Sequence, residues 1–152
     1  MQITEASYHD KMPSVLSDIA HQSKAHWKYP TEWLDLWDEE LNVSKKEILE
    51  HDTFVVRTAG KIIGFAMVVQ HSDYDEIDHF WIHPDYIGQG YGGLLMREVL
   101  GRYPIKQRTL HALADPSARP FYEKSGFKHI QDIASSIPNR TLPLMVLQKG
   151  LY

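Results

Sequence analysis

Four glycines stand close together at positions 88, 90, 92 and 93, between an apolar stretch and a segment with leucines at helical spacing. Glycine lets the backbone approach an anion closely, because it has no Cβ and adopts conformations that other residues avoid. The unpaired N–H groups of a first helical turn and the helix dipole both favour negative charge. Residues 83–95 therefore predict a phosphate-binding loop that opens a helix.

The composition is that of one globular domain, and we expect residues 1–152 to form it. The formal net charge of −4 and the scattered basic residues argue against a nucleic-acid partner. The absence of cysteine excludes disulfides, thiolate metal ligands and catalysis through a thiol, and the nine histidines show no metal-binding spacing. No apolar run is long enough to span a bilayer and Met1–Glu5 lacks a signal pattern, so we expect a cytoplasmic protein without metal.

The first third of the chain is predicted to be mainly helical. Apolar residues recur at helical spacing over residues 8–23 and 31–41, after a short strand at 2–6. Ser44 and Glu47 have the spacing of a capping box, in which each side chain satisfies an unpaired N–H, and this predicts a third helix to about Glu50.

The rest of the chain alternates strands with helices. Residues 53–58 and 61–70 are rich in Val, Ile and Phe around Ala59-Gly60, which predicts a hairpin. Further strands are expected at 77–83, 108–113, 127–133 and 142–147. Helices are expected at 92–102, closed by Tyr103-Pro104, and at 116–125, with Gly126 as the C-terminal cap.

The spacing Gly88-x-Gly90-x-x-Gly93 also fits a dinucleotide fingerprint, with Asp115 as the ribose-binding acid. A chain with this fingerprint would be a nucleotide-binding oxidoreductase, and two features argue against that interpretation. Residues 83–87 separate the strand from the glycines, and a hairpin precedes them instead of βαβ units. No Lys-Ser or Lys-Thr follows the last glycine, so a Walker phosphate loop is excluded.

Two motifs resemble the GNAT superfamily of acyl-CoA N-acyltransferases. The first, the family's pyrophosphate loop, reads Ile82-His83-Pro84 and then Ile87-Gly88-Gln89-Gly90-Tyr91-Gly92, with Ile87 where the family commonly has Gln or Arg. The second is similar to Asn-x-x-Ala-x-x-x-Tyr-x-x-x-Gly-Phe and runs from Asp115 through Ala118 and Tyr122 to Gly126-Phe127, with Asp115 in place of Asn.

The resemblance implies an α/β (α+β) fold with a central mixed, mostly antiparallel sheet, two splayed parallel strands and flanking helices. In such a fold the splayed strands correspond to residues 77–83 and 108–113, and acetyl-CoA lies in the gap with its pantetheine against the strand backbone. The residues that the resemblance assigns to acetyl-CoA are Trp81, Ile82, Ile87, Gly88, Gln89, Gly90, Tyr91, Gly92, Gly93, Asp115 and Tyr122.

The reaction implied is attack of a neutral amine on the thioester carbonyl in a ternary complex. A backbone N–H near Ile82 is expected to stabilise the oxyanion, and Tyr122 to protonate the leaving thiolate. Glu76 is the expected base, with Asp78, which shares its strand face, and His79, His83 and His111 as alternatives.

The amine acceptor, a small molecule or a peptide, stays open. Trp27, Tyr29, Trp33, Trp37 and the acids Asp35, Asp38 and Glu39 are candidates to border its pocket, and an acidic rim suits a cationic amine. No membrane partner is expected, and the resemblance leaves a homodimer open. A non-catalytic acyl-CoA-binding or sensing domain is the alternative to an enzyme.

Overall fold

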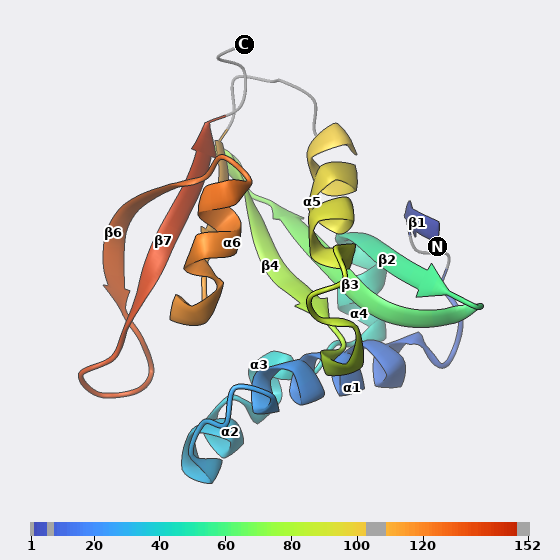
Figure 1. Cartoon of the computed structure of the whole chain (residues 1–152), viewed down its shortest axis with the longest axis horizontal. Coiled ribbons are helices and arrows are strands. Elements are labelled where there is room, and N and C mark those ends of the chain that lie inside the picture. The colour runs from blue at the N-terminus through green and yellow to red at the C-terminus, as the bar shows by residue number, and fades with distance from the viewer. Residues whose placement is uncertain (1, 6–7, 103–108, 149–152) are drawn as a thin grey trace. The chain divides into compact units, whose positions relative to one another are not determined.

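The computed structural model describes residues 2–5, 8–102 and 109–148, and for residues 2–5 the backbone alone (Figure 1). The chain divides into two compact units. Unit 1 comprises Met1–Met67 and His79–Val99, and unit 2 comprises Val68–Asp78 and Leu100–Tyr152. The single domain at residues 1–152 stays a prediction.

Unit 1 contains the predicted hairpin. Strand β1 (Gln2–Glu5) pairs antiparallel with β2 (Asp52–Thr58), and β2 turns into β3 (Lys61–Gln70), whose last residues belong to unit 2. Ala59 (φ 50°) and Gly60 (φ 77°) both have positive φ, as the tight turn of a twisted hairpin requires. The hairpin at 53–58 and 61–70 is confirmed.

Two of the predicted N-terminal helices are present. Helix α1 (Met12–Ala25) begins later than expected and buries Leu16, Ile19 and Ala20. Helix α4 (Lys45–Glu50) has the complete capping box, with the Glu47 N–H donating to Ser44 Oγ and the Ser44 N–H to Glu47 Oε1. The local signal at Ser44 was sufficient to locate this helix.

The single helix expected at 31–41 is wrong, because the chain forms α2 (Thr31–Leu36) and α3 (Asp38–Leu41). Trp37 lies between them with φ −89° and ψ −1°, in the sparsely populated bridge region. Three acidic residues fill the first turn of α3, where the helix dipole favours them: Asp38, Glu39 and Glu40.

Trp37 is buried in an aromatic cluster of Tyr29, Trp33 and Trp37, which surrounds Lys24 from α1. The Lys24 Nζ lies 4.2 Å from the centroid of the Trp37 ring and 5.2 Å from that of Tyr29, so cation–π attraction links α1 to the α2–α3 segment. Trp27 is exposed, and the role of these aromatic residues toward an acceptor stays a prediction.

Strand β4 (Tyr74–Ile82) begins before the predicted residue 77 and leads through a 3-10 turn at Pro84–Tyr86 into α5 (Tyr91–Arg102). Gly64 of β3 lies against the end of β4. A Cβ at position 64 would stand 2.6 Å from Ile82 Cδ1 and 2.9 Å from the Trp81 carbonyl oxygen. The close approach of these two strands therefore requires glycine at this position.

Unit 2 is built on the C-terminal strands. The start of β4 pairs parallel with β5 (Thr109–Leu113), in a register from Tyr74 with Thr109 to Glu76 with His111. Strand β7 (Thr141–Gln148) pairs antiparallel with both β5 and β6 (Lys128–Ala134). Residues 103–107 and Arg108, which include the expected Tyr103-Pro104 stop, lie outside the described residues.

The helix expected at 116–125 is interrupted, forming a 3-10 turn, η2 (Pro116–Ala118), and then α6 (Arg119–Lys124). Pro120 has no N–H to donate to the Pro116 carbonyl, so a continuous α-helical ladder cannot begin at residue 116. Gly126 ends the element with φ 97°, which confirms the predicted cap.

The hydrogen-bonded strand order is β1-β2-β3-β4-β5-β7-β6. The described pairings β1–β2, β5–β7 and β6–β7 are antiparallel, and β4–β5 is parallel. The predicted α/β class, with helices flanking a mixed, mostly antiparallel sheet, is confirmed. This sheet is not the parallel one that a dinucleotide-binding fold requires, so the dinucleotide interpretation is wrong.

In the part of the chain that the structure describes, every helix is too short or too polar to cross a membrane.

The approach of β3 to β4 generates a stability prediction. Gly64→Ala should lower the free energy of unfolding by about 1–3 kcal/mol, because the added methyl group must displace backbone at Trp81. Urea denaturation measures the loss. Gly101→Ala is the matched control: Gly101 lies in α5 with open space where the methyl group would stand, so this variant should be neutral or gain up to about 1 kcal/mol. Equal effects of the two substitutions would contradict this account.

Candidate functional site

The glycine loop forms where predicted, at the start of α5 in unit 1. Gly88 (φ 81°) and Gly90 (φ 88°) have left-handed backbone, and a Cβ at either position would meet nothing within 4 Å. These two glycines are therefore required by the path of the backbone and leave open space beside it. Gln89 and Ile87 are exposed on the same loop.

The helix end at this loop presents N–H groups. The Leu94 N–H donates to the Gly90 carbonyl at 3.3 Å and begins the helical ladder. The N–H groups of Tyr91, Gly92 and Gly93 precede that bond, so their own helix offers them no carbonyl. With the helix dipole, this end of α5 has the charge and the donors that an anion such as a pyrophosphate needs.

The loop is fixed by contacts around His83. The Asp85 N–H donates to His83 Nδ1 at 3.1 Å, so the other ring nitrogen, Nε2, donates to Gln22 Oε1 at 2.7 Å. Gln89 Nε2 donates to the Asp85 carbonyl at 3.2 Å. Gln89, which we expected at the cofactor, thus also closes the loop on itself.

The end of β4 is held by α1 and β3. Ser23 Oγ, buried in α1, donates to the Ile82 carbonyl at 2.9 Å, and the His83 N–H donates to the Ile63 carbonyl at 2.7 Å. The Trp81 indole donates to His79 Nδ1 at 3.0 Å. Sequence analysis missed Ser23, because no local pattern marks a hydroxyl that reaches a distant strand.

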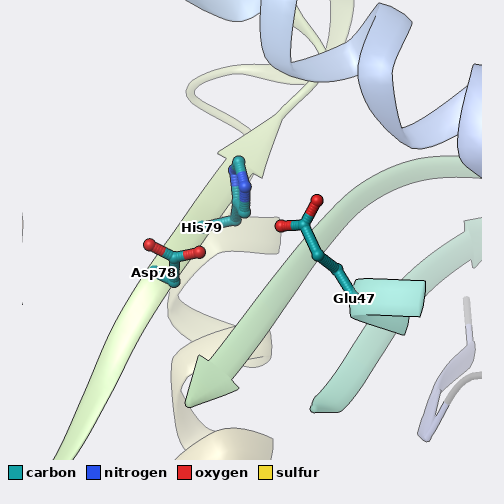
Figure 2. A group of neighbouring side chains, drawn as sticks. All are labelled: Glu47, Asp78 and His79. Carbon is teal, nitrogen blue, oxygen red and sulfur yellow. The ribbon is translucent and has the colours of Figure 1, made fainter. Parts of the chain in front are cut away.

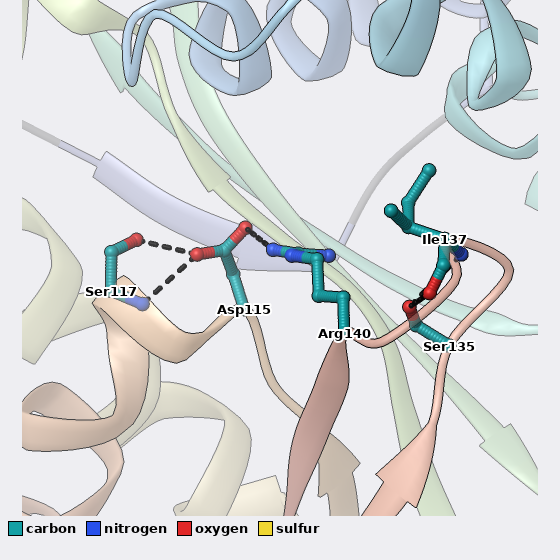
Figure 3. A network of polar contacts seen from close by, with 5 residues as sticks. All are labelled: Asp115, Ser117, Ser135, Ile137 and Arg140. Carbon is teal, nitrogen blue, oxygen red and sulfur yellow. Dashed lines mark hydrogen bonds and ion pairs between the residues drawn. The ribbon is translucent and has the colours of Figure 1, made fainter.

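In unit 2, Asp115 has a structural role that its sequence motif did not indicate. Its Oδ1 accepts from the Ser117 N–H at 2.9 Å and from Ser117 Oγ at 2.7 Å, and so caps the 3-10 turn η2. Its Oδ2 lies 3.5 Å from Arg140 Nη2 (Figure 3). Ser135 and Ile137 form the turn that delivers Arg140 to this pair. Asp115 as a cofactor ligand stays a prediction.

Tyr122 lies in α6 and is buried, with its ring 5.5 Å from that of Phe121 and 5.2 Å from that of Phe127 between centroids. Burial raises the pKa of its phenol well above the usual value, because the phenolate would lose its hydration. Tyr122 therefore keeps its proton at neutral pH, but it is a weaker acid than the ordinary phenol that we expected from the sequence.

Glu76 lies in β4 and is half-buried. Its Oε1 is 2.9 Å from Nε2 of His71, a histidine in the β3–β4 connection that we did not predict. Glu76 also stands opposite His111 in the parallel register. Sequence analysis did not single out His71, because no local pattern links a residue of the β3–β4 connection to Glu76 within β4.

Among the described residues, one group of side chains is spaced to hold a metal ion. Glu47 and His79 of unit 1 bring one ligand atom each within 4.8 Å of each other, and Asp78 precedes His79 in β4 (Figure 2). His79 Nδ1 already accepts from the Trp81 indole, and Asp78 is exposed. Carboxylates near a histidine are common without a metal, and these contacts support none here.

A protein-family comparison matches residues 50–129 to the acetyltransferase (GNAT) domain. The matched segment includes both motifs, from the hairpin through the glycine loop to the Gly126 cap. No curated protein sequence is similar enough to this chain to count as a relative.

Solved structures share the fold at low sequence identity. The PaiA N-acetyltransferase of Thermoplasma acidophilum, in complex with coenzyme A, has a TM-score of 0.74 at 18% identity, over 97% of this chain and 99% of that one. The Escherichia coli ribosomal-protein-S18-alanine N-acetyltransferase has a TM-score of 0.70 at 18% identity, over 99% and 96%. An aminoglycoside 6'-N-acetyltransferase complexed with coenzyme A has a TM-score of 0.66 at 16% identity, over 97% of each chain.

The pair of Asp115 and Arg140 is largely shielded from solvent, with side chains 11% and 13% exposed for Asp115 and Arg140, so its removal should cost stability. Asp115→Ala removes the cap of η2 and the ion pair to Arg140, and should lower the free energy of unfolding by about 1–3 kcal/mol. Asp115→Asn keeps an oxygen for the Ser117 N–H and should lose less. Urea denaturation compares both with Glu123→Gln, which breaks an exposed ion pair to Arg119 at 3.2 Å and should cost less than about 1 kcal/mol. An equal loss for Asp115→Ala and Glu123→Gln would contradict the structural role.

Proposed function

Because the chain belongs to the GNAT acetyltransferase family, we propose that it transfers an acetyl group from acetyl-CoA to a primary amine in a ternary complex. The observation that carries the proposal is the glycine loop at the start of α5, where the left-handed Gly88 and Gly90 precede unpaired helical N–H groups. Structural neighbours of the same fold are complexed with coenzyme A.

The pyrophosphate of acetyl-CoA is proposed to lie on the N–H groups of Tyr91, Gly92 and Gly93. The other residues proposed to bind it are those expected from the motifs: Trp81, Ile82, Ile87, Gly88, Gln89, Gly90, Asp115 and Tyr122. Ile87 supplies no polar group, so the backbone donors carry most of the affinity for the phosphates.

We propose direct transfer without an acyl-enzyme. The lone pair of a neutral amine forms a C–N bond with the thioester carbonyl carbon, and the C–S bond breaks. The nitrogen loses a proton to solvent to become an amide, and the coenzyme leaves as a thiolate that takes up a proton. Tyr122 is the proposed proton donor, and its burial keeps the phenol protonated at neutral pH. Glu76 is proposed as the base that removes the proton from the ammonium form of the acceptor.

The acceptor is proposed as a primary amine of a small molecule or a peptide. The named neighbours include one that acts on a ribosomal-protein alanine and one named for aminoglycosides, so the fold alone does not choose between these classes. Asp35, Asp38 and Glu39 are exposed, and these acids favour a cationic acceptor. The cytoplasm is the compartment we propose, and a homodimer is an open prediction.

The affinity for coenzyme A tests the role of the left-handed loop backbone. Gly90→Ala should weaken coenzyme A binding by about 10-fold or more, because a side chain disfavours the left-handed φ that aims the N–H groups. Isothermal titration calorimetry measures the affinity. Gly60→Ala is the matched control, since Gly60 also has positive φ and open space but lies in the β2–β3 turn. It should lose similar stability and keep its affinity; a similar loss of affinity in both variants would remove the loop from the proposal.

Turnover tests the role of the Tyr122 hydroxyl. Tyr122→Phe keeps the ring contacts and removes the hydroxyl, so it should lower kcat by about 10²-fold with the acetyl-CoA affinity kept. Thiol release with a panel of amines gives kcat, and Tyr8→Phe is the control that should leave it unchanged. Wild-type turnover in Tyr122→Phe would remove Tyr122 as the acid. Wild-type protein that binds acetyl-CoA and releases no thiol with any amine would indicate a non-catalytic binding domain instead.

A further inference from the structure

The end of helix α1 holds two successive residues at the point where β4 ends and the glycine loop begins. Ser23 Oγ donates to the Ile82 carbonyl at 2.9 Å, and Nε2 of the His83 ring donates to Gln22 Oε1 at 2.7 Å. These residues belong to unit 1, as do the glycine loop and the start of α5. Two neighbouring side chains of one helix therefore fix the last carbonyl of the strand and the first side chain of the loop.

The His83 ring is hydrogen-bonded at both nitrogens. Nδ1 accepts from the Asp85 N–H at 3.1 Å, and a ring nitrogen that accepts carries no proton, so the proton lies on Nε2 and is donated to Gln22. Asp85 Oδ2 lies 3.8 Å from Nδ1, beyond hydrogen-bond distance. The two hydrogen bonds support each other, because the Gln22 oxygen favours the one tautomer that can accept from Asp85.

A series of aromatic contacts leads from this ring to the start of α5. The His83 ring lies 6.1 Å from that of Tyr86, edge to face with 72° between the planes, and the Tyr86 ring lies 6.0 Å from that of Tyr91 with 73°. The Tyr86 N–H also donates to the His83 carbonyl at 2.9 Å. Tyr91 is the first residue of α5, and its N–H is one of the three proposed to hold the pyrophosphate. The orientation of His83 is thus linked to the backbone that would face the anion.

Gln22 and Ser23 differ in burial, and this difference separates their roles. Ser23 is buried, so its loss would affect folding as well as the loop. The Gln22 side chain is exposed, and that of His83 is 17% exposed. Substitution of an exposed side chain changes stability little, so an effect of Gln22 on ligand affinity can be measured without loss of the fold.

This inference rests on the proposed function. We propose that Gln22 is a positioning residue for the coenzyme. It holds His83 in the tautomer that accepts the Asp85 N–H, and so keeps the loop in the shape that aims the N–H groups at the start of α5 before the pyrophosphate arrives. A preformed set of donors binds an anion more tightly, because less free energy is lost in ordering the loop on binding. Gln22 acts through His83 and does not touch the coenzyme itself.

The experiment measures the affinity for coenzyme A by isothermal titration calorimetry at pH 8, where an ordinary imidazole is neutral. Gln22→Met has a similar size and lacks the amide oxygen, and it should weaken binding by about 3- to 10-fold, the effect of one hydrogen bond. Asn42→Leu is the matched control, because Asn42 Oδ1 lies 2.8 Å from Nε2 of His21 in another exposed contact of α1. It should keep the affinity, and both variants should keep the urea midpoint of wild type.

A second background tests whether Gln22 acts through His83. His83→Phe keeps a ring beside Tyr86 and removes both nitrogens, so Gln22→Met should weaken binding no further in that background. A further loss of the same size there would overturn the proposal, since Gln22 would then act by another route. Wild-type affinity in Gln22→Met, or an equal loss in Asn42→Leu, would overturn it as well.

NMR of the His83 ring nitrogens gives a readout that needs no ligand. Wild type should carry the ring proton on Nε2, and Gln22→Met should show a mixture of the two tautomers. An unchanged tautomer would overturn the proposal, and this test stands even if His83→Phe does not fold. Wild type that shows the Nε2 tautomer and binds no coenzyme A would overturn the proposed function, and with it the role in binding, but leave the hydrogen bond of Gln22 to His83.

Discussion

The hydrogen bonds at the end of β4 determine where the glycine loop begins. Ser23 holds the Ile82 carbonyl from α1, and the Ile63 carbonyl holds the His83 N–H from β3. Gly64 lets the two strands come close enough for these contacts, because any side chain there would meet the backbone of Trp81. The position of the loop is therefore a consequence of packing in unit 1 as well as of its own glycines.

The start of α5 and the pair of Glu76 and His71 have opposite electrostatic character. The start of α5 offers backbone donors and a helix dipole to an anion without placing a charged side chain there. In unit 2, by contrast, a carboxylate oxygen of Glu76 lies 2.9 Å from Nε2 of His71. Lys24 differs from both, because its ammonium group lies against the aromatic rings of Trp37 and Tyr29 and is stabilised by their faces.

Elements with local signals could be predicted from the sequence. The capping box at Ser44, the Ala59-Gly60 turn and the Gly126 cap each depend on a few neighbouring residues, and all are confirmed. The break at Trp37 could not be predicted, because the helical spacing of apolar residues continues through it while its indole packs on Lys24. The sequence contained a sign of the interruption before α6, because Pro120 has no N–H to donate. That this proline leads to a separate 3-10 turn also depends on the Asp115 cap, which the sequence did not indicate.

Some residues of the candidate site could likewise be predicted from local sequence patterns, and others could not. The glycines of the loop follow from sequence spacing, and Tyr122 and Glu76 from a family pattern, whereas Ser23, His71 and Arg140 act through contacts that no spacing shows. These contacts depend on chain turns and strand registers, such as the parallel pairing of Glu76 with His111.

The most direct test of the central claim is calorimetric titration of the protein with acetyl-CoA, beside coenzyme A and NADH. The account predicts binding of acetyl-CoA and coenzyme A and none of NADH, because the start of α5 is proposed to hold the pyrophosphate of an acyl-CoA. Absence of acetyl-CoA binding, or preference for NADH, would contradict it.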